Sequence, residues 1–199
     1  MSNLHDIPIR IADMLIELTS PLSAAELGIE ESLGPFRAAG VSKSPLARVA
    51  LRWEDSASAP APRGELIYDP GSIWKMYRTG SDFFAAIAYE GATGAGQAQS
   101  VLRANYAWDD LTLTEHRDDA SWRSLLNLGA GELILRAAIL LTGGLVFHAS
   151  GLDDNGKGVV FVGHSGAGKS TQMGLWSHEP GVLAMNDDRM AVRVEAGGP

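Results

Sequence analysis

Residues 163–170 form the most specific motif in the chain. They read GHSGAGKS, the G-x-x-x-x-G-K-S pattern of a phosphate-binding loop, in which backbone N–H groups, a lysine and a hydroxyl surround a polyphosphate. The apolar run 158–162 before the loop predicts a buried strand, and residues 170–176 after it predict a helix. Strand, loop and helix N-terminus follow in the order that such a site requires. The predicted nucleotide-binding residues are Gly163, His164, Ser165, Gly166, Ala167, Gly168, Lys169, Ser170 and Thr171.

Composition limits the partners of the chain. The formal net charge of -8 over 199 residues opposes binding to nucleic acid or to an anionic membrane, because both attract basic surfaces. The longest apolar region, 133–147, is interrupted by Arg136 and Gly143-Gly144 and is too short to span a bilayer. Without cysteine there is no disulfide and no thiolate metal site. We therefore expect a cytoplasmic protein with no nucleic-acid or membrane partner.

The first part of the chain predicts a β-rich domain over residues 1–118, for which we expect a recognition or docking role. Short runs rich in β-branched and aromatic residues alternate there with turn residues. These predicted strands cover 7–19, 47–53, 64–68, 73–78, 83–89 and 101–106.

Residues 119–199 predict a second, nucleotide-binding domain, so the expected fold class is α+β. The expected elements are a helix from a Ser121 cap to residue 141, strands at 145–152 and 158–162 joined by a tight turn at Asn155-Gly156, the loop and its helix, a buried strand at 182–185 and a strand at 190–194. A nucleotide-binding sheet with so few strands has an open edge. We therefore expect the domain to be incomplete and the chain to be truncated at its C-terminus.

The acidic pair Asp187-Asp188 supplies the second half of a phosphoryl-transfer site. Such a reaction needs positive charge on the phosphates, which Lys169 and a metal held by Ser170 supply, and a carboxylate that activates the acceptor. The apolar strand 182–185 ends at the pair, beside the expected loop strand, so its carboxylates can reach the metal or the γ-phosphate. Neighbouring residues on a strand point to opposite faces, so we expect the two acids to have different roles. For His148, position in an apolar strand leaves a structural and a functional role equally open.

Three segments taken together resemble the catalytic core of the HPr kinase/phosphorylase family: 148–151, the loop 163–171, and Asn186-Asp187-Asp188-Arg189. The resemblance covers roughly residues 140–194 and implies a P-loop kinase core related to phosphoenolpyruvate carboxykinase, with ATP and Mg²⁺ as cofactors. It implies that Lys169 binds phosphates and that Ser170 binds the metal, for which we expect Asp187, from its place beside the loop, as a second ligand. It also implies that Asp188 accepts the proton of a serine hydroxyl, supported by His148 and Asp187.

The expected function is an ATP-dependent kinase that phosphorylates a hydroxyl, most simply a serine of a protein or peptide. Two alternatives stay open at this point. One is a nucleotide-binding regulatory or scaffold protein without transferase activity, and the other is a P-loop ATPase in which Asp188 acts on water. Self-association into a homo-oligomer is also left open.

Overall fold

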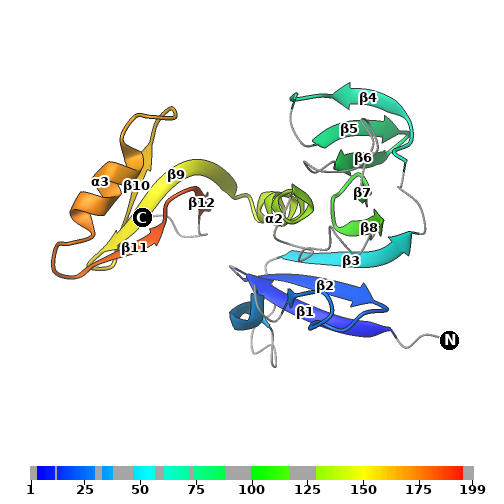
Figure 1. The fold of residues 1–199 in the computed structure, drawn as a ribbon, viewed down its shortest axis with the longest axis horizontal. Helices are drawn as coiled ribbons and strands as arrows, with labels where there is room; N and C mark the ends of the chain where they lie inside the picture. The colour runs from blue at the N-terminus through cyan, green and yellow to red at the C-terminus, as the bar shows by residue number, and fades with distance from the viewer. Residues whose placement is uncertain are drawn as a thin grey trace. The chain divides into compact units, whose positions relative to one another are not determined.

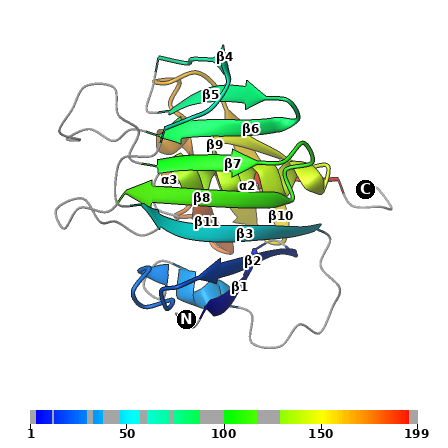
Figure 2. The ribbon, with the colours of Figure 1, turned by 90° about the vertical axis from the view of Figure 1, so that its right-hand side faces the viewer.

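The computed structural model describes residues 4–11, 13–29, 33–37, 47–56, 61–71, 74–87, 100–116 and 129–194 (Figures 1 and 2). The chain divides into two compact units, Met1–Thr142 and Gly143–Pro199, which we describe one at a time. Among the described residues, no helix has the length and apolar character that a membrane crossing requires.

The first unit is built on an eight-stranded sheet in the order β1-β2-β3-β8-β7-β6-β5-β4. Its elements are β1 (His5–Ile11), β2 (Met14–Ser20), a 3₁₀ turn η1 (Gly34–Phe36), β3 (Ala47–Ser56), β4 (Glu65–Tyr68), β5 (Trp74–Thr79), β6 (Asp82–Ile87), β7 (Ser100–Ala104), β8 (Asp110–His116) and helix α2 (Gly129–Leu141). The pairs β2–β3 and β3–β8 are parallel and the remaining neighbours are antiparallel. The sheet is therefore mixed.

The core of this unit forms between the sheet and α2. Leu111 and Leu113 lie two residues apart on β8, hence on the same face of the strand, and both are fully buried. Leu133 and Ile134 of α2 belong to the same buried cluster. Trp53 on β3 is also buried there, and its indole N–H donates to the Glu115 carboxylate at 2.9 Å. The buried carboxylate thus has a hydrogen-bond partner, as stability demands.

Leu113→Ala tests this core. Leu113 is 0% exposed, so its truncation leaves a cavity, and we expect the free energy of unfolding to fall by about 2–5 kcal/mol. Leu66→Ala on β4, where Leu66 is 47% exposed, is the matched control and should change it by less than about 0.5 kcal/mol. Denaturant unfolding followed by circular dichroism measures both. Equal effects of the two variants would show that the face of β8 is not buried as described.

The second unit carries the phosphate loop on a small antiparallel sheet. It contains β9 (Leu145–Asp154), β10 (Lys157–Val162), α3 (Lys169–Trp176), β11 (Val182–Asn186) and β12 (Arg189–Val192). β10, β11 and β12 all pair antiparallel with the long strand β9. The expected hairpin is confirmed, and its turn residues Asn155 and Gly156 have φ values of 51° and 86°, as a tight hairpin turn requires.

Strand β9 lies between β10 and β11, in the order β10-β9-β11. Val162, the last residue of β10, pairs with Ala149, and Asn186, the last residue of β11, pairs with Gly151. The carboxyl ends of both strands therefore reach the same part of β9. This arrangement brings the phosphate loop and the acidic pair to the same end of β10 and β11.

The predicted fold class, α+β with a P-loop kinase core of the HPr kinase type, is wrong. Strands dominate the described residues, in which only α2 and α3 are α-helices, and the larger sheet is mixed. The strand that leads into the phosphate loop belongs to a hairpin, so it needs no helical crossover to its neighbour. The strands expected to be buried are also largely exposed: Val162 on β10 and Leu183 on β11 are accessible to solvent.

The division between the compact units, at Thr142 and Gly143, differs from the predicted domain boundary after residue 118. Helix α2, which the sequence pattern assigned to the second domain, contributes to the core of the first unit. The predicted boundary and the predicted helix residues 121–128 lie outside the described residues.

Candidate functional site

The phosphate loop joins the end of β10 to the start of α3. Gly166 and Gly168 have φ values of 80° and 85°, a left-handed conformation that glycine adopts without strain. Gly168 is the N-cap of α3 and offers no capping side chain, so the first N–H groups of the helix are left for an anion. The loop therefore has the backbone geometry of an anion-binding site.

Lys169 lies at the mouth of this loop. Its Nζ donates to the carbonyl oxygen of Gly163 at 2.9 Å and to that of His164 at 3.1 Å. The His164 Nδ1 is 2.7 Å from the Ser165 carbonyl oxygen, which directs that ring toward its own backbone. The ammonium group is thus held over the loop, where a phosphate can replace the carbonyls as its partner.

Asp187 connects the phosphate loop to β9. The hydroxyl of Ser150, on β9 and fully buried, donates to Asp187 Oδ1 at 2.6 Å. This hydrogen bond first, and one from the Ser170 hydroxyl second, hold the pKa of the Asp187 carboxyl below its usual range, and the charge of Lys169 acts in the same direction. The carboxylate is consequently ionised and held beside Ser170.

Asp188 belongs to a second cluster. Its Oδ1 lies 2.9 Å from His148 Nδ1 and 2.5 Å from Arg189 Nη1, and the same Arg189 nitrogen lies 2.8 Å from His148 Nδ1. His148 and Arg189 face each other as register partners on β9 and β12. The imidazole Nδ1 either donates a proton to Asp188 or accepts a hydrogen bond from Arg189, so its tautomer decides which partner it has.

Solvent exposure limits what this cluster contributes to stability. The side chains of His148 and Asp188 are 54% and 64% exposed, and ion pairs at such sites contribute little to folding. The Asn186 side-chain oxygen accepts the backbone N–H groups of Asp188 at 2.8 Å and Arg189 at 2.9 Å, a turn that fixes the acidic pair after β11. The arrangement is therefore better suited to chemistry at an accessible surface than to holding the fold together.

The donors present fit a magnesium ion. Asp187 and Ser170 offer hard oxygen ligands next to each other, and Mg²⁺ in nucleotide sites commonly takes one or two carboxylates together with waters and substrate phosphates. Within the described ranges no cluster of three or more His, Asp or Glu side chains is placed to hold a metal alone. A metal at Asp187 and Ser170 would accordingly depend on the nucleotide for further ligands.

The candidate residues thus lie in two neighbouring groups of one unit. Lys169, Ser170 and Asp187 form the first, and Asp188 with His148 forms the second, so the two acids do contact different partners. The remaining loop residues 163–168 and Thr171 lie around Lys169, most of them exposed.

Sequence reasoning missed Ser150 and Arg189 as site residues. Ser150 lies two positions after His148 on β9, and strand alternation places such residues on the same face. That spacing could have identified the serine as a partner of the acidic pair. Arg189 directly follows the pair, but its position opposite His148 depends on the pairing of β12 with β9.

Ser150→Ala tests the link between β9 and Asp187. The folded pKa of Asp187 is lowered, so the hydrogen bond stabilises the ionised form above the ordinary pKa of about 3.9, and this contribution is lost as the pH falls through the lowered value. Removing the hydroxyl should raise the Asp187 pKa toward its ordinary value and weaken Mg²⁺–nucleotide binding about 10–100-fold. Carboxyl ¹³C shifts in an NMR titration measure the pKa.

Ser177→Ala is the matched control, because the Ser177 hydroxyl bonds the Gly174 carbonyl in α3 and not the acidic pair. It should leave the Asp187 pKa unchanged. An unchanged pKa in Ser150→Ala would contradict the assigned hydrogen bond.

Comparison with known proteins identifies no family for the chain. No protein-family model, no curated protein and no solved structure matches the chain.

Proposed function

We propose that this chain is an ATP-dependent kinase that transfers the γ-phosphate to a hydroxyl, most simply a serine of a protein or peptide. The observation that carries the proposal is the position of Asp187, which accepts hydrogen bonds from Ser150 on β9 and from Ser170 at the end of the phosphate loop. The proposal rests on these side chains and not on a kinase fold.

Each group has a distinct task in this reaction. The loop N–H groups and the Lys169 ammonium bind the phosphates, and Ser170 and Asp187 would hold Mg²⁺, which would neutralise phosphate charge. Asp188 accepts the proton of the acceptor hydroxyl. At the same time the hydroxyl oxygen bonds to the γ-phosphorus of ATP, and the bond between that phosphorus and the leaving oxygen of ADP breaks. His148 and Arg189 hold the Asp188 carboxylate in position through the contacts described above.

The exposure of Asp188 favours a macromolecular acceptor over a small enclosed one. The carboxylate lies at an open surface, where a serine on a protein or a flexible peptide can reach it. The first unit, with its large mixed sheet, is proposed to recognise this acceptor. The reaction would take place in the cytoplasm, where ATP is available.

Transfer of labelled phosphate tests the proposal directly. The protein is mixed with Mg²⁺ and γ-labelled ATP in a single turnover, with the proteins encoded by neighbouring genes as acceptors. We expect label on serine of one of them. If inorganic phosphate is released at the same rate with and without an acceptor protein, the result would support an ATPase instead. Nucleotide binding without turnover would support a regulatory protein.

A further inference from the structure

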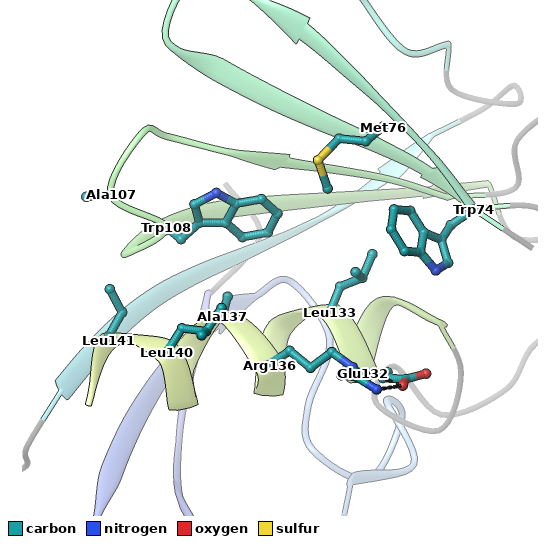
Figure 3. A pocket seen from close by; sticks show the side chains of 10 residues that line it. All are labelled: Trp74, Met76, Ala107, Trp108, Glu132, Leu133, Arg136, Ala137, Leu140 and Leu141. Carbon is teal, nitrogen blue, oxygen red and sulfur yellow. Dashed lines mark hydrogen bonds and ion pairs between the residues drawn. The ribbon is translucent and has the colours of Figure 1, made fainter. Parts of the chain in front are cut away.

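The first unit contains a cavity that the proposed reaction does not use. It has a volume of about 520 Å³ and lies between α2 and the strands and turn that carry Trp74, Met76 and Trp108 (Figure 3). This volume is within the roughly 300–1,000 Å³ typical of sites for small organic ligands. No residue of the phosphate loop or the acidic pair lines it.

The wall on the sheet side is aromatic. In Figure 3 the indoles of Trp74 and Trp108 and the thioether of Met76 lie above α2, and Leu133 and Ala137 rise toward them from the helix. Ring contacts hold both indoles. The ring centroids of Trp74 and Tyr68 are 5.4 Å apart, and those of Trp108 and Phe83 are 5.9 Å apart. Held aromatic faces of this kind favour a flat aromatic partner.

Trp108 is held in an unusual backbone conformation. Its φ is 59°, in the left-handed region, which is an outlier for so bulky a residue. The turn is fixed by the Asn105 side-chain oxygen, which accepts the backbone N–H of Asp109 at 3.1 Å, and by the Trp108 N–H, which donates to the Asn105 carbonyl at 3.1 Å. Strain of this kind persists where the surrounding structure enforces it and is concentrated at binding sites.

The charges around the cavity cancel. Among the described residues that line it, only Glu132 and Arg136 are charged, and Arg136 reaches back along α2 to the Glu132 carboxylate at 2.6 and 3.0 Å. A charged ligand would have to break this ion pair or remain unpaired in an apolar site, and either would reduce its binding free energy. A peptide backbone would face the same problem, since the wall is mostly hydrocarbon and offers few hydrogen-bond partners.

We propose that this cavity binds a neutral, planar aromatic small molecule. The ligand inserts between the two indoles and the Leu133–Ala137 face of α2. The site is independent of the proposed phosphoryl transfer, and its test uses no nucleotide.

The full chain is titrated with methyl 2-naphthoate, a neutral two-ring probe, and with 2-naphthoate, which has the same rings and a negative charge. Calorimetry and two-dimensional NMR measure the affinity and the residues affected. We expect one neutral probe per chain, with a dissociation constant of about 10 µM to 1 mM, and binding of the anion at least about tenfold weaker. The shifted NMR signals should be those of Trp74, Trp108 and α2.

Two variants locate the site. Ala137→Phe places a ring in the cavity and should reduce the affinity for the neutral probe at least about tenfold. Leu140 lies at the cavity mouth and its side chain is 61% exposed, so Leu140→Ala should have little effect on the stability of the fold. The variant should weaken binding of the neutral probe about three- to tenfold. Leu175→Ala, a similarly exposed leucine at 64% in the other unit, is the matched control and should change nothing.

Three outcomes would overturn the proposal. They are absence of binding to the intact chain, equal affinity for neutral and anionic probes, and binding that neither Ala137→Phe nor Leu140→Ala weakens. Sedimentation of the unliganded protein adds a fourth. If the chain dimerises and Leu140→Ala disrupts the dimer, a second copy covers the cavity and the small-molecule proposal fails.

Discussion

Lys169→Ala is expected to weaken ATP binding about 10–100-fold and phosphate transfer about 10²–10³-fold. The Lys169 ammonium lies over the loop carbonyls of Gly163 and His164, where in the proposed reaction it would meet the phosphates both in the bound state and during transfer. Because one charge serves both states, binding and rate should fall together. Equilibrium titration with Mg²⁺–ATP and single-turnover transfer measure the two quantities.

Lys157→Ala is the matched control for this variant. Lys157 begins β10 in the same unit, is exposed, and makes no contact with the loop that the structure describes. The variant removes the same charge as Lys169→Ala, but at the end of β10 that is remote from the loop. It should therefore leave ATP affinity near that of the unaltered protein. Equal affinities of Lys169→Ala and the unaltered protein would show that the loop does not bind phosphate.

Asp188→Asn is expected to lower the rate of transfer about 10²–10⁴-fold while ATP affinity stays nearly unchanged. The amide keeps the size of the side chain and can still accept a hydrogen bond from Arg189, but it cannot accept the proton of the acceptor hydroxyl. Asp188 contacts His148 and Arg189 and not Lys169, so nucleotide binding should not depend on its charge. Single-turnover transfer measured beside equilibrium binding separates the two effects.

Asp154→Asn controls for the change of charge. Asp154 lies at the far end of β9, at the hairpin turn, and bonds Asn155. It should alter neither rate nor affinity. Transfer at the normal rate in Asp188→Asn would remove this residue as the base, whereas loss of ATP binding in it would assign the carboxylate to the nucleotide or metal.

The phosphate loop and the hairpin before it could be predicted because their signals are local. Gly166, Gly168 and Gly156 all adopt positive φ, and the sequence places glycine at each of them. Most strands of the first unit were predicted for the same reason. Strand β8 was missed, although Leu111 and Leu113 alternate with threonines, the period-two pattern of a half-buried strand.

Local sequence patterns specify the short elements and the loop, because their conformations depend on neighbouring residues. Strand pairing, and with it the fold class and the partners of the acidic pair, arises from contacts between segments far apart in the chain. Ser150 meets Asp187 across 37 residues because β9 lies between β10 and β11, and Arg189 meets His148 because β12 pairs with β9. Strand pairing depends on which faces distant segments bury and on the register that this burial selects, and no local pattern contains that information.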